Sequence, residues 1–424
     1  MSRVVVIGAG AMGLAAAYHA LKRGHQVTVL EAAPEAGGMA AHFDLGGLSI
    51  ERYYHFVCKA DQSTFDLLAE LGLSDKMRWV PTSMGYYIDG RLYPWGDPLS
   101  LLTFPKLSLI EKLRYGAMMF FSTRRNDWRS LENVSAKDWI TRWCGSAVYE
   151  RLWAPLFRLK FFEYAENISA AWIWTRIKRV GTSRRSLFQE ELGYIEGGSE
   201  TLVHALVRAI EAKGGVLRLN APVTRALIEN NRVVGVIVGE EFFAADAVIS
   251  TVPTPYVGRI VPELPERARY AAIANIGVVC VVFRLKRSVT PHFWVNISDP
   301  RFEIPGVVEF SNLRPTGDTV VYIPYYMPVT HEKFARDDTF FRTEGFGYLK
   351  LLNPALREDD VVAFYVGRLR HAQPVCPPGF AAMLPPVETS IDGLQIADTC
   401  FYYPEDRGIS ESVRFGRLMA ERVR

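Results

Sequence analysis

The chain has 424 residues, 49% of them hydrophobic and 22% charged, which is enough for two lobes that each bury a core. Its formal net charge of +3 is small for this length and excludes a general electrostatic affinity for nucleic acid. Five scattered cysteines without a Cys-x-x-Cys pair exclude a disulfide scaffold or a zinc site, and they indicate a reducing, cytoplasmic compartment.

The first residues predict a strand and a glycine-rich turn, with no signal peptide before them. Residues 3–7 are a β-branched apolar run that is typical of a buried parallel strand. The next six residues, Gly8-Ala9-Gly10-Ala11-Met12-Gly13, form a complete G-x-G-x-x-G motif. Gly8 permits the tight turn, Gly10 lets the backbone approach a pyrophosphate, and Gly13 lets the following helix pack against the strand.

The helix that follows is predicted over residues 14–23, and its free N-terminal amides and positive dipole end favour a diphosphate. A second strand at 26–30 ends in Glu31. A carboxylate at this point accepts hydrogen bonds from both hydroxyls of an adenosine ribose and repels a 2′-phosphate. Strand, glycines, helix, second strand and Glu31 in this order predict a Rossmann-type dinucleotide site.

A second pair of glycines, Gly37-Gly38, follows Glu31 and is completed by Met39. Here the sequence resembles the FAD-binding amine oxidase superfamily, in which this pair touches the cofactor phosphates; simple NAD dehydrogenases lack it. Many members have arginine where this chain has Met39. The resemblance implies a non-covalent FAD whose first block of contacts comprises Gly8, Gly10, Ala11, Met12, Gly13, Glu31, Gly37, Gly38 and Met39.

Two central segments also resemble flavin-contacting parts of this superfamily. The aromatic run Tyr53-Tyr54-His55-Phe56 is similar to a segment that passes the flavin ring, so Tyr54 is expected beside the cofactor. A block of strands begins at Val223, where the superfamily backbone usually meets the adenine. The last strand of this block leads through Thr251, which is also expected at the cofactor.

The chain closes with a strand at 393–398 and a helix from about Ile409. In the superfamily these elements return to the flavin. Asp398 stands where an acidic residue binds the ribityl chain, and the helix N-terminus at Gly408 and Ile409 faces the pyrimidine end of the ring. The dipole of that helix favours an anionic reduced flavin.

These segments predict an α/β fold with a discontinuous Rossmann-type FAD-binding domain and a second, α+β domain for the substrate. The FAD-binding domain is assembled from residues 1–80, 187–270 and 385–424. The substrate domain takes residues 81–186 and 271–384.

Local signals predict several elements inside these domains. Ser63–Asp66 is typical of a capping box that opens a helix, and Ser108 with Glu111 is a second one at the start of a helical region, 108–179. Asp89-Gly90 between aromatic runs predicts a hairpin. Residues 271–384 are expected to be rich in strands.

Two branches of the superfamily fit the remaining segments. One contains protoporphyrinogen oxidases and phytoene desaturases, and the other is UDP-galactopyranose mutase, whose overall reaction is redox-neutral. Residues similar to the mutases lie in four segments, 51–56, 138–145, 154–160 and 167–172. The mutases, however, carry a Gly-Arg pair where this chain has Ala397-Asp398. The arginines considered for a substrate diphosphate are Arg158, Arg368 and Arg370, with ordinary surface or scaffold roles as the alternative.

The favoured function is therefore FAD-dependent oxidation or desaturation of a hydrophobic small molecule by hydride transfer to flavin. A mutase-like flavoenzyme acting on a nucleotide-linked or lipid-linked sugar is the alternative, and a flavin-binding structural subunit is a non-enzymatic one. The cofactor supplies the chemistry in such enzymes, and the sequence carries no Ser-His-Asp or metal-binding constellation.

His55 is the candidate catalytic residue, with a structural hydrogen-bonding role as the alternative. The tyrosine pairs at 325–326 and 402–403 are candidates for an aromatic cage or for core packing. Many amine-oxidising members carry a lysine on a strand like 277–283, and its absence here argues against a simple amine oxidase. Cys376 and Cys400 do not match a flavin-attachment motif, which favours non-covalent FAD.

The expected partner is a small-molecule substrate. Leu109, Leu113, Ala117 and Phe120 form a helical stripe, predicted as the core of a lobe, with a membrane-surface patch as the alternative. The basic pairs at 178–179 and 184–185 are expected on a solvated face. No uncharged apolar run reaches the length of about 18 residues that a spanning helix requires.

Overall fold

Strand β1 (Arg3–Ile7) lies at the centre of a five-stranded parallel sheet in the computed structural model, which describes residues 1–424. Its apolar residues are buried, as expected for a parallel strand covered on both faces. The strand order is β10-β2-β1-β14-β20. The flanking strands are β2 (Gln26–Leu30), β10 (Val216–Arg218), β14 (Ala247–Ser250) and β20 (Leu394–Ile396).

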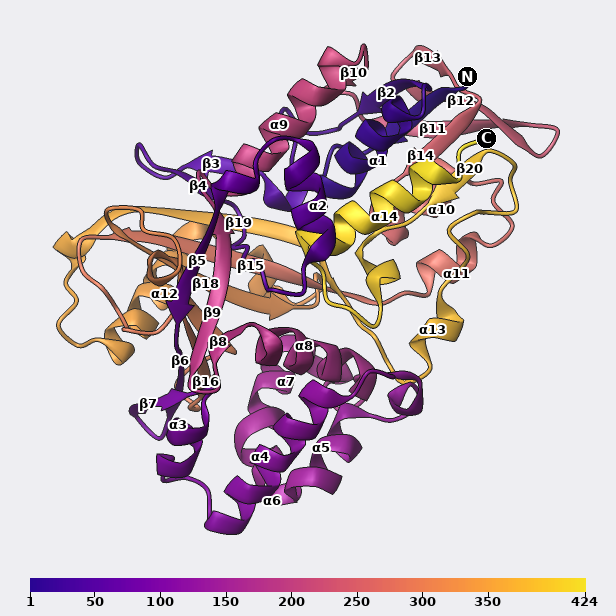
Figure 1. The fold of residues 1–424 in the computed structure, drawn as a ribbon. Coiled ribbons are helices and arrows are strands. Elements are labelled where there is room, and N and C mark those ends of the chain that lie inside the picture. Colours follow the sequence, from indigo (N-terminus) through magenta and orange to yellow (C-terminus); the bar gives the residue numbers. More distant parts are fainter.

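Three helices, α1 (Ala11–Lys22), α9 (Ser199–Ala212) and α14 (Ile409–Glu421), accompany this sheet, and α1 contacts both of the others (Figure 1). The approach of α1 to α14 requires a glycine, because a Cβ at Gly416 would lie 2.4 Å from the Met12 carbonyl oxygen. The two ends of the chain lie side by side, and the Ser2 hydroxyl donates to the Arg424 carbonyl oxygen at 2.6 Å.

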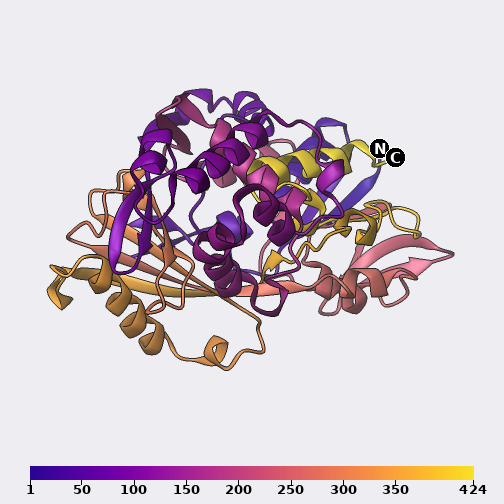
Figure 2. The ribbon, with the colours of Figure 1, turned by 90° about the horizontal axis from the view of Figure 1, so that it is seen from below.

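A seven-stranded sheet with the order β19-β15-β18-β17-β16-β6-β7 forms the second large layer. Neighbouring strands are antiparallel except β16 and β6, which are parallel. Its long strands reach toward the five-stranded sheet (Figures 1 and 2), and α12 (Asp338–Leu352) packs on it. The strands are β6 (Met84–Ile88), β7 (Arg91–Trp95), β15 (Asn275–Leu285), β16 (Trp294–Ser298), β17 (Gly306–Glu309), β18 (Thr319–Met327) and β19 (Val361–Pro374).

A lobe of helices lies below both sheets in the view of Figure 1. A π-helical turn, Tyr149–Trp153, joins two of its helices. Trp139, Phe157 and Trp172 are buried in its core. The helices are α3 (Pro98–Thr103), α4 (Leu109–Arg124), α5 (Ala136–Cys144), α6 (Ser146–Val148), α7 (Ala154–Phe161) and α8 (Ala170–Thr182).

Smaller sheets and helices connect these layers. Strand β5 pairs with β9, and β9 pairs with β8. The small strands are β3 (His42–Asp44), β4 (Ser49–Glu51), β5 (Met77–Thr82), β8 (Arg184–Ser186), β9 (Gln189–Ile195), β11 (Val223–Glu229), β12 (Arg232–Val238) and β13 (Glu241–Ala244). The short helices are α2 (Gln62–Glu70), α10 (Val257–Ile260), α11 (Arg267–Ala271) and α13 (Phe380–Met383).

The predicted fold class is confirmed: a Rossmann-type α/β domain stands beside a second domain with a sheet and helices. The hairpin around Asp89-Gly90 is present, and φ values of 49° and 75° at these residues match the left-handed turn that joins tightly paired strands. Ser108 and Glu111 form the predicted capping box of α4. The exact domain boundaries stay a prediction.

Residues 271–384 are rich in strands as predicted, since β15 to β19 lie there, and they also contain a long helix, α12. Two predictions about elements are wrong. Helix α2 begins at Gln62 with Asp61 as its N-cap residue, so Ser63 does not open a capping box. The stripe on α4 is not a lobe core, because Leu109 and Leu113 are 66% and 61% exposed. The buried face of α4 is offset from this stripe and carries Tyr115, Met118 and Ser122.

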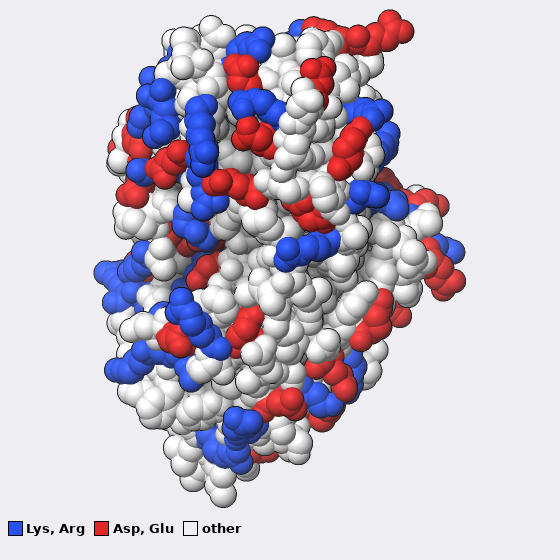
Figure 3. Space-filling view, turned by 90° about the vertical axis from the view of Figure 1, so that its right-hand side faces the viewer, with Lys and Arg blue, Asp and Glu red and all other residues white.

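The charged surface is mixed in sign. On the face drawn in Figure 3, basic and acidic side chains alternate, and no large field of one sign covers it. No cluster of three or more His, Cys, Asp or Glu side chains is arranged to hold a metal ion. None of the helices combines the length and the apolar character needed to cross a bilayer.

Candidate functional site

A single large cavity of about 1440 Å³ begins at the glycine-rich turn after β1 and extends to the helical lobe. One end is formed by the two glycine loops and Glu31. The middle is bounded by residues 53–56 and the N-terminus of α14. The far end is lined by side chains of α4, α7 and α8 together with β15 and β18.

The glycine loop after β1 has the geometry that the sequence predicts. Gly8 has a φ of 101°, and a Cβ there would lie 2.6 Å from the Thr251 hydroxyl oxygen. A Cβ at Gly13 would lie 1.9 Å from the Gly8 carbonyl oxygen, so only glycine lets α1 pack here. A Cβ at Gly10 would meet no protein atom within 4 Å, because Gly10 faces the open cavity. That open space is where a pyrophosphate fits.

The second glycine loop lies directly on the first. The Gly37 amide donates to the Ala9 carbonyl oxygen at 2.8 Å, and a Cβ at Gly38 would lie 3.2 Å from the Cα of Gly10. Glu31 stands beside both loops and accepts from the amides of Ala9 at 2.7 Å and Ala33 at 2.8 Å. These bonds fix the carboxylate at the cavity wall and leave further lone pairs for ribose hydroxyls.

Asp398 and the start of α14 close the middle of the cavity. The Asp398 carboxylate accepts from the Thr254 amide at 2.6 Å and the Cys400 amide at 2.8 Å, so it joins two loops that end strands of the parallel sheet. Gly408 is the N-cap residue of α14, and no side chain forms a capping hydrogen bond with the amides at this end of the helix. The free amides at this helix end favour negative charge in the cavity.

Every residue predicted to contact FAD lines this one cavity except Gly13. Gly13 lies behind the cavity wall, where its role is the close packing of α1. Val223, Thr251 and Met39 line the cavity near the first glycine loop, as the sequence predicts. A long cavity with a glycine cradle at one end and a helix N-terminus in its middle fits an extended dinucleotide such as FAD.

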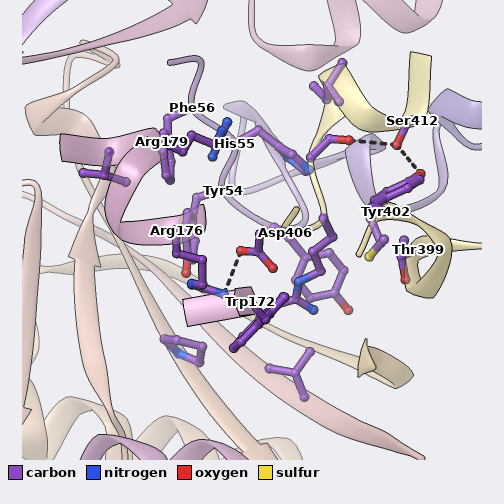
Figure 4. A pocket seen from close by; sticks show the side chains of 18 of the residues that line it. Tyr54, His55, Phe56, Trp172, Arg176, Arg179, Thr399, Tyr402, Asp406 and Ser412 are labelled. Carbon is purple, nitrogen blue, oxygen red and sulfur yellow. Dashed lines mark hydrogen bonds and ion pairs between the residues drawn. The ribbon is translucent and has the colours of Figure 1, made fainter. Parts of the chain in front are cut away.

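Tyr54 and His55 lie on the cavity wall opposite the C-terminal segment (Figure 4). The Tyr54 ring packs edge-on against Trp294 and Tyr322, with centroid distances of 5.5 and 5.6 Å. His55 Nδ1 is buried without a hydrogen-bond partner. Burial lowers the pKa of His55 to about 4, so the imidazole is neutral at pH 7.

A group of cationic side chains lines the far half of the cavity, and sequence analysis did not predict it. Lys160 comes from α7, Arg176 and Arg179 from α8, and Arg407 from the segment before α14. Arg179 pairs with Asp61 at 2.7 Å, and both Arg179 and Arg184 line the cavity, so the prediction of a solvated face is wrong for these two residues. Arg185 is exposed, as predicted. Basic residues recur every few positions on many amphipathic helices, usually on the solvent side. The sequence therefore does not indicate that the basic residues of α7 and α8 face a cavity.

The arginines considered from the sequence for a substrate diphosphate lie elsewhere. Arg158 is exposed and pairs with Glu150 at 2.8 Å, and Arg368 pairs with Asp338 at 2.6 Å. Neither these two nor Arg370 lines the cavity. That prediction is wrong because α7 and β19 turn these side chains outward.

The tyrosine pairs do not form a shared cage. Tyr326 and Tyr402 line the cavity, whereas Tyr325 is buried in the separate core under α12. The Tyr403 hydroxyl is bonded to the Ser169 hydroxyl at 2.7 Å, outside the cavity. Neighbouring residues on a strand such as β18 point to opposite faces, so only one member of that pair reaches the site.

All five cysteines are buried and free. Cys376 and Cys400 do not line the cavity, and Cys280 is the one that does. Burial raises the pKa of the Cys280 thiol to about 12, so it stays protonated and is a poor nucleophile.

Comparison with known proteins agrees with this geometry. A family model described as flavin containing amine oxidoreductase matches residues 13–340, more than half of the chain. The chain belongs to this family. Membership in the flavin-containing amine oxidoreductases confirms the resemblance drawn from the glycine blocks and implies a flavin cofactor for the cavity.

Individual relatives in this family are distant. The 15-cis-phytoene desaturase of Synechococcus elongatus is 23% identical over 317 residues, which cover 68% of this chain and 66% of the desaturase. An oxidoreductase from Methanosarcina mazei has a TM-score of 0.73 and 19% identity, covering 98% of this chain and 99% of that one. Reduced UDP-galactopyranose mutase has a TM-score of 0.72 and 15% identity, covering 99% and 93%. These solved structures share the fold.

Proposed function

We propose that the protein is an FAD-dependent oxidoreductase that oxidises or desaturates a hydrophobic small molecule by hydride transfer to the flavin. The observation that carries this proposal is the continuity of one cavity from the glycine cradle, past the N-terminus of α14, into a compartment lined mostly by apolar and aromatic side chains. Such a cavity accommodates a dinucleotide and, beyond it, an apolar substrate.

In this proposal the chain holds a non-covalent FAD along its whole length. The amides around Gly10 and the N-terminus of α1 receive the diphosphate, and Glu31 accepts the ribose hydroxyls. Asp398 accepts from the ribityl chain. The amides at Gly408 and Ile409 favour the negative charge that a reduced ring carries.

When bound, FAD supplies the acceptor for a hydride that leaves a substrate C–H bond. The protein orients that bond and keeps water away from it. Large side chains of the helical lobe, together with Trp95 at the end of β7, enclose this part of the cavity; those of the lobe are Tyr115, Met119, Trp153, Phe157 and Trp172. His55, neutral and without a partner, provides a hydrogen-bonding group rather than a charge.

The cofactor proposal is tested by replacing Gly10 with valine. The new side chain occupies the space that the pyrophosphate needs, so we expect purified Gly10→Val protein to be colourless, whereas the parent protein is yellow and releases intact FAD on acid denaturation. Gly347→Val is the control, because Gly347 lies on α12 and its Cβ would also meet no atom within 4 Å. A parent protein that folds but carries NAD or no flavin would refute the proposal.

One observation favours a second candidate, a mutase-like enzyme that acts on a sugar diphosphate. The cations in the far half of the cavity offer bidentate and point-charge contacts of the kind that phosphates take. We nevertheless expect no isomerisation of UDP-galactopyranose by the chemically reduced protein, because Ala397-Asp398 replaces the Gly-Arg pair of the mutases. Turnover of UDP-galactopyranose above about one per second would favour the mutase-like function over the oxidoreductase function.

We further propose that the protein contacts a membrane surface through the outer face of the helical lobe. Three neighbouring segments, α3, α4 and the turn between β8 and β9, carry large exposed apolar side chains: Leu99, Leu102, Leu109, Ile110, Leu113, Phe120, Phe121, Leu187 and Phe188. Phe120 and Leu187 also line the cavity, so this apolar patch surrounds one of its openings. Exposed Arg114, Arg124 and Arg185 lie among them, which favours an anionic bilayer.

A further inference from the structure

The cations in the far half of the cavity form a compact group around two aromatic rings. Lys160 Nζ lies 5.4 Å from the centroid of the Trp172 ring and 5.0 Å from that of Tyr326. The Arg176 guanidinium lies 4.6 Å from the centroid of the Trp172 ring, and the Arg407 guanidinium lies 5.8 Å from the centroid of the Tyr326 ring. Residues from two consecutive helices, α7 and α8, and from the distant C-terminal segment therefore place their positive charges around the same two rings.

The charge of this group is not balanced by the protein. Asp406 is the only carboxylate paired with it and contacts Arg176 at 2.7 Å. Lys160 makes no hydrogen bond and no ion pair. Arg407 donates to the Ala372 carbonyl oxygen and, at 3.1 Å, to the Tyr326 hydroxyl, neither of which is charged. When Lys160 is protonated, three cations and one carboxylate leave two positive charges facing the cavity.

Two further groups without hydrogen-bond partners, from Trp153 and Asp406, belong to residues that line the same cavity. The Trp153 indole N–H is buried without an acceptor, and Trp153 lies two turns before Lys160 on one continuous helical segment. Asp406 Oδ1 is buried without a donor as well, but it is an acceptor and belongs to the one negative charge already counted against the cations. Buried donors and unpaired cations are costly in a folded protein unless a ligand satisfies them. A donor-rich, positively charged compartment selects an anion.

We propose that Lys160, Arg176 and Arg407 bind a phosphate or carboxylate group of the substrate, which is therefore an anionic amphiphile. This inference rests on the proposed function, since it assigns the substrate class of the same cavity. The apolar wall beside the cations receives the hydrocarbon part. The same charges repel an ammonium group, so the site selects against amine substrates although its family includes them.

The state of Lys160 supports this assignment. Burial and the neighbouring guanidinium groups of Arg176 and Arg407 lower the pKa of Lys160, while Asp406 raises it only in part. An anion placed between these three cations opposes their mutual repulsion. A bound anion therefore stabilises the protonated, charged form of Lys160, and this charged form in turn attracts the anion.

The test uses single-chain amphiphiles that share a dodecyl chain and differ in their headgroup. Binding of dodecyl phosphate, dodecanoate, dodecanol and dodecylamine to the flavin-loaded protein is measured by calorimetry and by change in the flavin absorption spectrum, below their micelle concentrations. We expect the two anions to bind at least about tenfold more tightly than the alcohol, and the amine to bind most weakly. A preference between the two anions distinguishes a phosphate from a carboxylate substrate.

Lys160→Met separates anion binding from a structural role. Because Lys160 has no ion-pair partner, this change leaves no carboxylate unpaired, so we expect an unchanged or higher melting temperature and a loss of about tenfold or more in affinity for the anion. Arg158→Met is the matched control: it removes one positive charge from the same helix, but outside the cavity.

Several outcomes would overturn the assignment. Equal affinity for dodecyl phosphate and dodecanol would show that the cavity has no anion site. Unchanged anion binding in Lys160→Met would show that Lys160 does not bind the anion. Loss of FAD from Lys160→Met, or competition between the phosphate probe and FAD, would show that these cations serve the cofactor instead. A parent protein without flavin would refute the proposed function, and calorimetry would still report whether the anion binds.

Discussion

At the scale of single residues, His55 is the polar side chain whose role the structure sharpens most. Its Nδ1 is buried without a partner and its residue lines the cavity, as expected for a group that meets a ligand. We expect His55→Ala to alter the flavin absorption spectrum or its rate of reduction while FAD stoichiometry stays intact, because the ADP half is proposed to bind in another part of the cavity, at Gly10 and Glu31. His292→Ala is the control, since His292 is buried outside the cavity and should change only the melting temperature. Destabilisation without a spectral change in His55→Ala would assign it to the core.

Some residues of the site could be predicted from the sequence and others could not. The glycines and Glu31 were predictable because each answers a local steric or hydrogen-bonding demand that a short motif encodes. Lys160, Arg176 and Arg407 were not, since their grouping depends on how α7, α8 and the C-terminal segment pack. Arg158 and Lys160 are two residues apart on one helix, and only the packing of α7 decides which of them faces the cavity.

At the scale of elements, α4 is unusual because it carries large apolar side chains at exposed positions, which a purely structural helix does not need. Its exposed apolar residues lie on the face away from the lobe core, where they cost solubility without adding packing. Periodicity alone predicted an apolar stripe on α4 correctly but assigned it to the core, because an interior face and a membrane-facing face have the same spacing.

We expect Ile110→Ser combined with Leu113→Ser to weaken binding to phosphatidylcholine vesicles that contain phosphatidylglycerol by about tenfold or more, since each side chain contributes roughly 1.5–3 kcal/mol when buried in an apolar phase. Both residues are exposed, at 70% and 61%, so the melting temperature should not change. Vesicle co-sedimentation at low and high salt is the measurement. Phe242→Ser on β13 is the control at a remote exposed site. Parent protein that stays in the supernatant under all conditions would refute membrane contact.

At the scale of the whole molecule, the discontinuous arrangement was predictable from the order of the motifs. Strands of the five-stranded sheet come from the N-terminus, the middle and the C-terminus, as the glycine blocks and the closing strand indicate. The long helix α12 was missed although its buried residues Phe341, Gly345, Tyr348 and Leu349 have helical spacing. Two glycines and several aromatic residues lower the helix propensity of this segment, and the helix packs on β15 and β19. The cavity exists only where these layers meet, so no single segment encodes its shape.

The place of α14 against α1 has a consequence for how the protein is made. All strands of the seven-stranded sheet and all helices of the helical lobe precede β20 and α14 in the chain, so these last two elements of the nucleotide domain are synthesised after the other two layers. Until they arrive, α1 exposes the surface that Gly416 later covers, and Asp398 does not yet join the loops at the middle of the cavity. We therefore expect the cofactor domain to be completed only after β20 and α14 have been synthesised, later than the strands and helices of the other two layers.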